Sequence, residues 1–300
     1  MFIINNRKLL YVFTAILIIA SIAALSVWGL KPGIDFAGGT LIEASYPVAA
    51  TTTPSQAALV SGISSIDPAV SVRPSSDGYF IRMKAVTQAE KAQVLDILSA
   101  SGMAQPTIKS FDSIGPVLGA ESLRKAIVSI ILVILGIVLY ITFAFRKVSE
   151  PVSSWKYGLI AIVSLVHDII IPLGAFSIFG HYLGYEIDTL FVTALLVILG
   201  FSIHNTIVVF DRVRENLSHN GGKNFDVTVG QSVNQTLTRS INTSLTVLIA
   251  LVSLYILGGE ATQHFTLALI VGILAGTYSS VCFGSSLLVT IEKWGRNRAK

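Results

Sequence analysis

The chain of 300 residues is 52% apolar and only 13% charged, with a formal net charge of +4. Soluble domains carry about 25% charged residues, so this composition excludes an ordinary soluble protein and indicates a polytopic α-helical membrane protein. Many of the basic residues flank apolar segments, which favours a role in membrane orientation and gives no reason to expect nucleic-acid binding. The single cysteine, Cys282, excludes an internal disulfide framework.

Six apolar runs predict six transmembrane helices, since a spanning helix needs roughly 17–25 residues. The first run is longer than a signal-peptide core of about 7–15 residues and no small-x-small cleavage site follows it, so we expect an uncleaved anchor. The expected divisions are residues 1–30 (N-terminus and first span), 31–125, 126–291 (five spans) and 292–300 (basic tail). The runs are Leu9–Leu30, Ala126–Phe145, Tyr157–Phe179, Ile187–Phe210, Ile241–Leu257 and Phe265–Ile291.

Basic residues gather on one side of this arrangement. The short loops of the other side, Gly180–Glu186 and Gly258–His264, contain no Lys or Arg. Cytoplasmic loops carry the excess of Lys and Arg, so both termini are predicted to be cytoplasmic. The basic residues on that side are Arg7, Lys8, Arg146, Lys147, Lys156, Arg212, Arg214, Lys223, Lys293, Arg296, Arg298 and Lys300.

The segment Lys31–Lys125 is the one large enough to fold in water, and its pattern predicts an extracytoplasmic α+β domain. Thr87 and Glu90 have the spacing of a capping box at the start of its second helix, and Gly102 is expected to end that helix. The order βαββαβ matches a ferredoxin-like fold, and a binding or docking role is expected. The elements are Thr40–Tyr46, the helix Pro54–Ile63, Ala69–Arg73, Tyr79–Lys84, the helix Thr87–Ala100 and Pro106–Phe111.

Two glycine-containing linkers, Lys31–Thr40 and Phe111–Ser122, are expected to bracket this domain. Glycine permits tight or left-handed backbone and close approach to a neighbouring surface. Structural turns are the favoured interpretation, and a hinge between the domain and the membrane is the alternative. No Gly-Lys-Ser/Thr ending follows, so a phosphate loop is not predicted. The glycines concerned are Gly33, Gly38, Gly39, Gly115 and Gly119.

Polar residues recur inside the third span. Such residues are costly in the bilayer core and usually face a bundle interior or an aqueous path. Ser164, His167 and Asp168 lie on one helical face. Since histidine titrates near neutrality, His167 and Asp168 form either a static hydrogen-bonded pair or a protonatable one.

The fourth span carries a second polar set. Ser202, Asn205 and Thr206 share one face, while His204 and Asp211 lie on an adjacent stripe. In the middle of this helix, His204 is the side chain able to exchange a proton near neutral pH. Asp211, beside Arg212, is interpreted as an interfacial charge.

The fifth and sixth spans carry polar and small residues. A polar face enters the fifth span, and we expect it to pair with polar groups of the fourth span rather than to snorkel. Gly272 and Gly276 give the sixth span a small-residue face suited to close packing. The polar face comprises Gln235, Arg239, Asn242, Thr243 and Thr246, and the small face continues through Thr277, Ser279 and Ser280.

Motifs of catalysis and metal binding are missing from the sequence. There is no Gly-x-Ser-x-Gly elbow and no His-Glu-x-x-His motif, so no enzyme activity, cofactor or metal is expected. Ser202 near His204 leaves an intramembrane hydrolase as an alternative, although residues two apart point to different sides of a helix.

Distinctive segments follow one another over most of the chain: GIDFAGGT, SIGPVLG, LVHDIIIPLG, SIHNTIVVFDRVREN, SVNQTLTRSINTSLT, and GGE followed by VGILAGTYSS. In this order they closely resemble the SecF family, whose members belong to the bacterial SecD–SecF complex and to the resistance-nodulation-division superfamily. The resemblance implies an accessory subunit of Sec protein export in the bacterial cytoplasmic membrane. Its partners would be SecD, the SecYEG channel with SecA, and exported unfolded polypeptide, within membrane lipid. The predicted domain agrees with the family's ferredoxin-like periplasmic fold.

The resemblance also implies use of the proton-motive force, with a departure in the fourth span. The family's Ser-x-Asn-Asp-Thr motif supplies an acid there, and the Arg that maps to Arg239 is part of the proton path. Here Asn205, which cannot titrate, replaces the acid, and His204 precedes it. Either His204 carries the proton, or the partner does and this chain is a structural half. The second account is simpler, because one residue rotates a side chain by about 100°. Asp168 remains as another carboxylate.

A different class of function is a small-molecule or lipid exporter of the same superfamily. Such a protein usually has a duplicated chain with twice as many spans and a larger outside region, neither of which this sequence contains.

Overall fold

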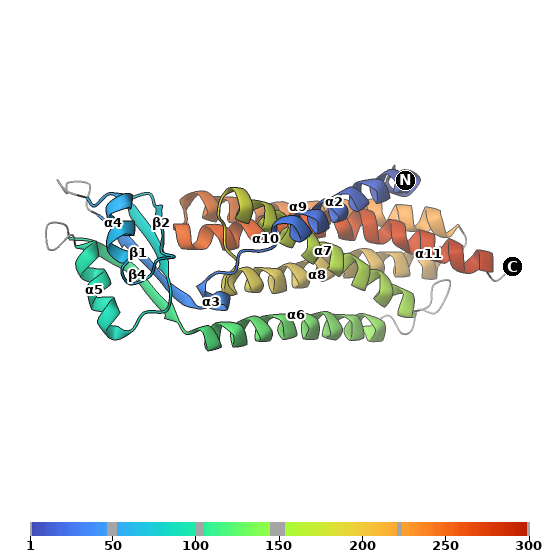
Figure 1. Ribbon diagram of the computed structural model, residues 1–300. Helices are drawn as coiled ribbons and strands as arrows, with labels where there is room; N and C mark the ends of the chain where they lie inside the picture. The colour runs from blue at the N-terminus through green and yellow to red at the C-terminus, as the bar shows by residue number, and fades with distance from the viewer. Residues whose placement is uncertain (1, 47–52, 100–104, 145–153, 221–223, 299–300) are drawn as a thin grey trace. The chain divides into compact units, whose positions relative to one another are not determined.

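The computed structural model describes residues 2–46, 53–99, 105–144, 154–220 and 224–298. The chain divides into two compact units (Figure 1): Pro32–Ala126, and a helical unit formed by Met1–Lys31 with Ile127–Lys300. Several residues used in the sequence analysis lie outside the described part of the chain: Gly102, Arg146, Lys147, Lys223 and Lys300.

Six helices in the described residues are long and apolar enough to cross a membrane, as the apolar runs predicted. The sixth is a continuous path of an α-helix, a π-helical turn and another α-helix. The protein is therefore a multi-pass membrane protein. In chain order the helices are α1 (Phe2–Asn5), α2 (Arg7–Trp28), α6 (Pro116–Ala144), α7 (Ser154–Tyr182), α8 (Thr189–Asn220), α9 (Phe225–Leu257), α10 (Glu260–Tyr278), π-helix η1 (Ser279–Gly284) and α11 (Ser285–Arg298).

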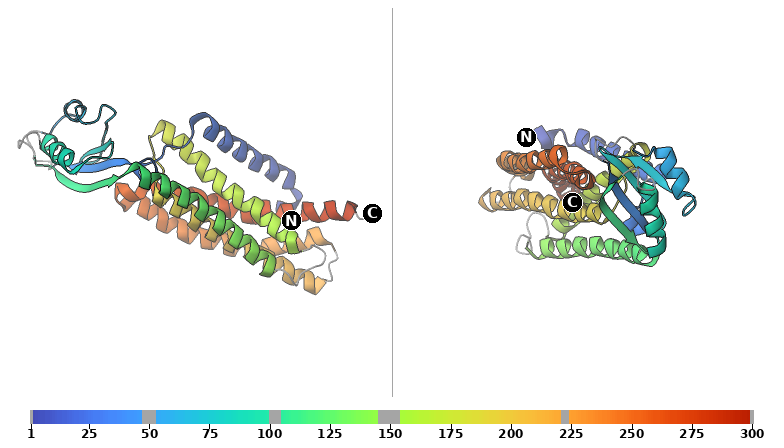
Figure 2. Two further views of the ribbon diagram at one scale, coloured as in Figure 1. Left: turned by 60° about the horizontal axis from the view of Figure 1, so that its bottom comes forward. Right: turned by 90° about the vertical axis from the view of Figure 1, so that its left-hand side faces the viewer.

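Helices α7, α8 and the sixth path form the interior of the helical unit. About half of each apolar stretch is buried there (50%, 44% and 61%), against 17% for α2 and 11% for α9. Helix α2 packs against α7, and α9 packs against α8 and α10. The left view of Figure 2 shows α2 (blue) alongside α7 (yellow-green). The polar residues of the third and fourth spans are therefore carried by interior helices.

Helices α8 and α9 are longer than the apolar runs that predicted them. Helix α9 begins at Phe225, not at Ile241, and α8 continues to Asn220. Apolar side chains spaced one turn apart on these extensions pack into one core cluster, with Val213 of α8 and Val229 of α9 fully buried. A hydropathy window misses such amphipathic turns because their other face is polar.

The smaller unit is a four-stranded antiparallel sheet in the order β2-β3-β1-β4. Its core joins Ile42 and Ile81, which face each other across β1 and β3, to Leu59 of α4 and Val94 of α5. The elements are α3 (Ile34–Ala37), β1 (Gly39–Ser45), α4 (Gln56–Ile63), β2 (Ser71–Pro74), β3 (Gly78–Met83), α5 (Gln88–Leu98) and β4 (Thr107–Ile114).

The predicted capping box at the start of α5 is present. The Thr87 backbone N–H donates to Glu90 Oε2 over 2.8 Å, and the Glu90 N–H donates back to Thr87 Oγ1 over 3.4 Å. The two groups satisfy each other at the helix end, where backbone donors otherwise lack partners.

The expected linker Phe111–Ser122 is not a linker. Residues up to Ile114 belong to β4, and α6 begins at Pro116, with Gly115 as the junction. Proline suits the first position of a helix because its fixed φ is helical and its missing N–H is not needed there. The prediction gave too much weight to Gly and Pro as loop residues.

The first predicted linker, Lys31–Thr40, contains the short helix α3 between two glycine positions. Gly33 precedes the helix with φ −70°, while Gly38 and Gly39 follow it with φ +74° and +128°. The last two adopt conformations that favour glycine.

Candidate functional site

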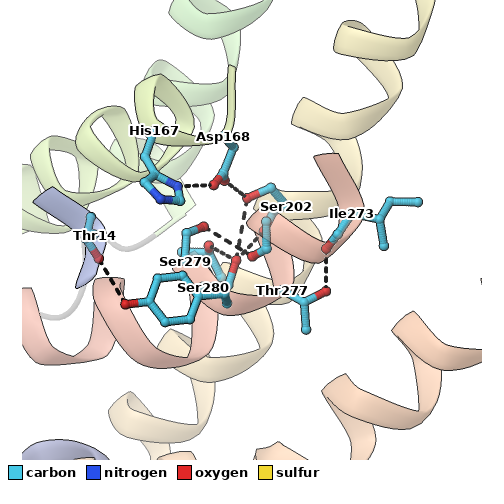
Figure 3. Close-up of polar contacts among 11 residues, drawn as sticks. Thr14, His167, Asp168, Ser202, Ile273, Thr277, Ser279 and Ser280 are labelled. Atoms are coloured by element: carbon cyan, nitrogen blue, oxygen red, sulfur yellow. Dashed lines mark hydrogen bonds and ion pairs between the residues drawn. The ribbon is translucent and has the colours of Figure 1, made fainter. Parts of the chain in front are cut away.

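A buried polar cluster lies where α7, α8 and η1 meet (Figure 3). We define it as the Asp168 cluster: His167, Asp168, Ser202, Thr206 and Ser280. Each residue is at most 1% exposed. Three separate helical segments therefore bring polar side chains together inside the helical unit.

Both carboxylate oxygens of Asp168 are engaged. His167 Nδ1 lies 2.9 Å from Oδ1, and the Ser202 hydroxyl donates to Oδ2. These two hydrogen bonds compensate the carboxyl group for the hydration that it loses on burial.

A chain of hydroxyl groups continues from Ser202 along the helices. Ser280 Oγ lies 3.5 Å from Ser202 Oγ and donates to the Ser202 carbonyl over 3.0 Å. Thr206 Oγ1 donates to Ser280 Oγ over 2.9 Å. A hydroxyl both donates and accepts, so the contacts form a continuous polar path of one helical turn, about 5 Å, starting at Asp168.

Close packing of the sixth span creates this arrangement. A Cβ added at Gly276 would lie 3.1 Å from Ser202 Cβ, and one at Gly272 would lie 2.1 Å from Ile198 Cδ1. The small-residue face predicted for this span therefore packs on α8. The π-helical turn η1 follows directly and carries Ser280. Single π-turns occur inside α-helices frequently at functional sites.

Three buried polar atoms near the cluster have no hydrogen-bond partner among the described residues: Ser164 Oγ, His167 Nε2 and Asn205 Nδ2. The His167 ring lies near two aromatic rings, with its centroid 5.9 Å from that of Phe283 and 6.2 Å from that of Tyr278. Buried polar atoms of this kind are normally satisfied by ordered water.

The other polar residues predicted for the fourth and fifth spans are not members of the Asp168 cluster. His204 is exposed on α8 and Arg239 is exposed on α9, whereas Asn205 is 2% exposed. Asp211 is exposed and lies 3.6 Å from Arg214. The cluster thus unites the polar residues of the third span with Ser202 and Thr206 of the fourth, without His204.

The expected pairing of the fifth span with the fourth is correct only at one end. Gln235 Oε1 accepts hydrogen bonds from Arg212 Nε over 2.6 Å and from Asn216 Nδ2 over 2.8 Å. For Arg239 and Asn242 the prediction was wrong within this chain, since both are exposed and neither has a polar partner among the described residues. A helical-wheel argument assigns side chains to a face but does not determine what the face meets.

Sequence reasoning assigned Ser280 to a packing face and missed its contact with Ser202. The signal was the pair Ser279–Ser280 directly after Gly276. Its polar role depends on the π-turn and on the neighbouring helix, and neither follows from local pattern.

In the part of the chain that the structure describes, no three His, Cys, Asp or Glu side chains lie together in a group that could hold a metal ion.

Comparison with known protein families gives two matches. The family model for protein export membrane protein SecD/SecF, C-terminal, matches residues 93–294. A model of the SecD/SecF GG motif matches residues 24–46, which include Gly38 and Gly39.

Similar proteins and structures agree with these matches. A protein translocase subunit SecF from Thermobaculum terrenum is 40% identical over 97% of this chain and 93% of its own. One from Synechocystis sp. is 34% identical over 96% and 93%. The crystal structure of SecDF from Thermus thermophilus, described as a translocon-associated membrane protein, matches with a TM-score of 0.81 and 28% identity over 97% of this chain. This chain spans 38% of that SecDF chain. By family model and by identity over nearly its full length, the chain belongs to the SecF family of protein translocase subunits.

Proposed function

We propose that this chain acts with a SecD-type partner in the bacterial cytoplasmic membrane and uses the proton-motive force to promote export of polypeptides through the SecYEG channel, alongside SecA. Family membership and the SecF name of the relatives support the export role. The similar SecDF structure, whose chain is much longer than this one, supports a SecD-type partner. The exporter alternative lacks comparable support.

We infer that Asp168 is the proton-carrying group of this subunit. The observation that carries this inference is a fully buried carboxyl group with a partner on each oxygen, at an interior helix contact. His167 and Ser202 can both donate hydrogen bonds to the charged carboxylate. When a proton arrives, the carboxyl group becomes a donor, and Ser202 can turn its own hydrogen towards Ser280. A charged and a neutral state can then both be accommodated without an unpaired oxygen.

The hydroxyl groups beyond Asp168, together with neighbouring water, would continue the proton route. The chain Ser202–Ser280–Thr206 leads one turn along α8. The unpartnered Asn205 Nδ2 lies on the same helix face as Thr206, and Ser164 Oγ lies one turn from Asp168 on α7. Water held by these atoms would extend the polar path on both sides of Asp168.

The exposed polar residues of α8 and α9 are proposed to face the SecD-type partner. Arg239, Asn242 and Thr246 lie on one exposed face of α9 at spacings of three and four residues. Since Arg212 contacts Gln235 and the two helices are antiparallel, equal steps along both bring His204 level with Thr243, next to Asn242. Polar groups at this depth are costly against lipid, which favours a protein surface over them.

A structural half-subunit without proton transit of its own is the second candidate. Asn205, at the position of the family's acid, favours it. The two candidates differ in whether Asp168 is needed for the response to the proton gradient.

The test is export driven by a proton gradient in inverted membrane vesicles that contain this chain and its partner. Replacement of Asp168 by Asn is expected to remove most of the gradient-dependent stimulation, and Ser202→Ala is expected to reduce it. His204→Ala should retain it if the charge change occurs at Asp168. Equal stimulation with wild type and Asp168→Asn, at equal amounts of assembled complex, would show that this subunit passes no proton through Asp168.

A non-enzymatic role is proposed for Ser202. In serine hydrolases the His contacts the nucleophilic Ser directly. Here Ser202 contacts Asp168, which separates it from His167, and the side chain is fully buried. Covalent labelling of Ser202 by a serine-directed probe would argue for an enzyme instead.

The smaller unit is proposed to be an extracytoplasmic domain of the ferredoxin-like class. Support comes from its element order β1-α4-β2-β3-α5-β4 and from the sheet order β2-β3-β1-β4. Its placement follows from the excess of Lys and Arg at the other ends of the spans, which also puts both termini in the cytoplasm. Protease added outside spheroplasts should cleave sites engineered into this unit and spare a tag on either terminus.

A further inference from the structure

A cavity of about 500 Å³ opens at the break between α1 and α2. It lies at the end of the helical unit where α11 is labelled in Figure 1. Helix α1 is held against α9 and α11 by Ile4, which is 3% exposed within the main core cluster. Asn6 leaves helical geometry with φ −96° and ψ +18°, and α2 starts at Arg7. The cavity is thus formed by α1, α2, α9 and α11, with Asn6 at the turn between the first two.

Positive charge exceeds negative charge in this cavity. Arg7, Lys8 and Lys293 line it together with one carboxylate, Asp226. Asp226 Oδ2 contacts Lys293 Nζ and lies 3.9 Å from Arg7 Nη1. Lys8 is exposed and pairs with no carboxylate among the described residues. Two net positive charges therefore remain, next to the positive end of the α2 dipole.

The cavity lies at the depth of lipid headgroups. Arg7 and Lys8 directly precede the first apolar run, which starts at Leu9. Trp294, beside Lys293, is 59% exposed, and tryptophan concentrates at the membrane–water interface.

An apolar strip continues from the cavity along α2. Leu9 lines the cavity and is 70% exposed, and Val12 and Ile16 beyond it are each 59% exposed. A basic site joined to an exposed apolar strip matches an amphiphile with an anionic head better than it matches a soluble anion. Basic pockets between transmembrane helices bind anionic lipid headgroups in this way.

We propose that this cavity binds an anionic glycerophospholipid, with the phosphate at Arg7, Lys8 and Lys293 and the acyl chains along α2. The lipid would tie α1 and α2 to α9 and α11 at their common end. The site is separate from the Asp168 cluster, and the proposal stands independently of proton transport.

Native mass spectrometry of the purified full-length chain, titrated with phosphatidylglycerol or phosphatidylcholine, tests the proposal. Wild type is expected to bind phosphatidylglycerol more tightly. The double variant Arg7→Gln/Lys8→Gln should weaken that binding by about fivefold for each residue removed, as expected for one basic residue near an anionic lipid. Asp226→Asn should strengthen it, because the competing carboxylate is lost.

Arg214→Gln is the matched control, since Arg214 is a basic residue of α8 that lies outside the cavity lining. Its affinity for phosphatidylglycerol should stay within twofold of wild type. Equal losses in Arg214→Gln and the double variant would mean general charge attraction and would overturn the site. Competition by soluble glycerol phosphate at the same concentration as the lipid would overturn the lipid assignment. Unchanged melting temperatures of the variants exclude misfolding as the cause.

Discussion

At the scale of single residues, Asp168 and His204 are the two ionisable groups to compare as proton carriers, and they lie in different surroundings. Both are ionisable and both lie within interior helices of the bundle. Asp168 has partners on each oxygen inside the protein, whereas His204 points to the outside of α8. Asp168 is therefore the carboxyl group at the centre of the buried polar contacts.

Loss of the Ser202 hydroxyl should destabilise the protein measurably. Ser202→Ala leaves Asp168 Oδ2 without its donor in a buried site, which costs about 1–3 kcal/mol. Thr193→Ala on the same helix is the control, because Thr193 is exposed and bonds only the Thr189 carbonyl. Its effect should stay within about 0.5 kcal/mol. Thermal unfolding of the two variants in detergent distinguishes these outcomes, and equal melting temperatures would contradict the buried contact.

Glu90 gives the smaller unit a defined response to acid. The Thr87 backbone N–H, followed by Lys84 and the Thr87 hydroxyl, lowers the pKa of Glu90 from 4.5 to about 2. A carboxyl group with a lowered pKa stabilises the fold above its unfolded-state pKa, and this contribution is lost as the pH falls towards the folded-state pKa. Glu90→Gln should therefore speed amide exchange in the first turn of α5 near neutral pH.

The same comparison at lower pH supplies the control for that prediction. Since protonated Glu resembles Gln, the difference in exchange should shrink from about pH 4.5 down to about pH 2. A difference that stays constant over this range would show that the Glu90 charge does not stabilise the capping box.

At the scale of elements, the junction of β4 with α6 packs against Gly38, directly before β1. A Cβ added at Gly38 would lie 2.8 Å from Pro116 Cα, and one added at Gly119 would lie 2.8 Å from the Gly38 nitrogen. Both contacts are with backbone, which cannot move aside as a side chain can. These two glycines are needed for close approach, whereas Gly115 has open space around it.

Alanine at Gly119 and at Gly136 should distinguish the effect of packing on stability from the effect of helix propensity. Gly119→Ala is expected to lower the free energy of unfolding by about 1–3 kcal/mol through overpacking. Gly136→Ala on the same helix meets nothing within 4 Å and should be neutral or stabilising by up to about 1 kcal/mol. Chemical unfolding of the full-length variants measures both, and a neutral Gly119→Ala would refute the close contact.

Much of the element order could be predicted from local pattern. The bilayer imposes a minimum length on apolar runs, and the capping box at Thr87 has a fixed spacing, so both were confirmed. The extension of α9 back to Phe225, the π-turn η1 and the helical start at Pro116 were missed. Each of these depends on packing against another part of the chain.

At the scale of the whole molecule, the exposed polar face of α9 implies a partner within the membrane. A disulfide crosslink between Asn242→Cys and a cysteine placed on the SecD-type subunit should form in membranes. Ile16→Cys on the exposed face of α2 is the control and should not crosslink to the same partner cysteine. Crosslinking from Ile16→Cys alone would place the partner on α2 instead.

Proton uptake by the reconstituted complex tests the central claim most directly. The chain and its SecD-type partner are placed in liposomes that contain a pH-sensitive dye, and proton entry is followed under an imposed gradient. Asp168→Asn is expected to remove the proton entry seen with wild type, and His204→Ala is expected to retain it. Unchanged entry with Asp168→Asn, or loss with His204→Ala alone, would contradict the central claim.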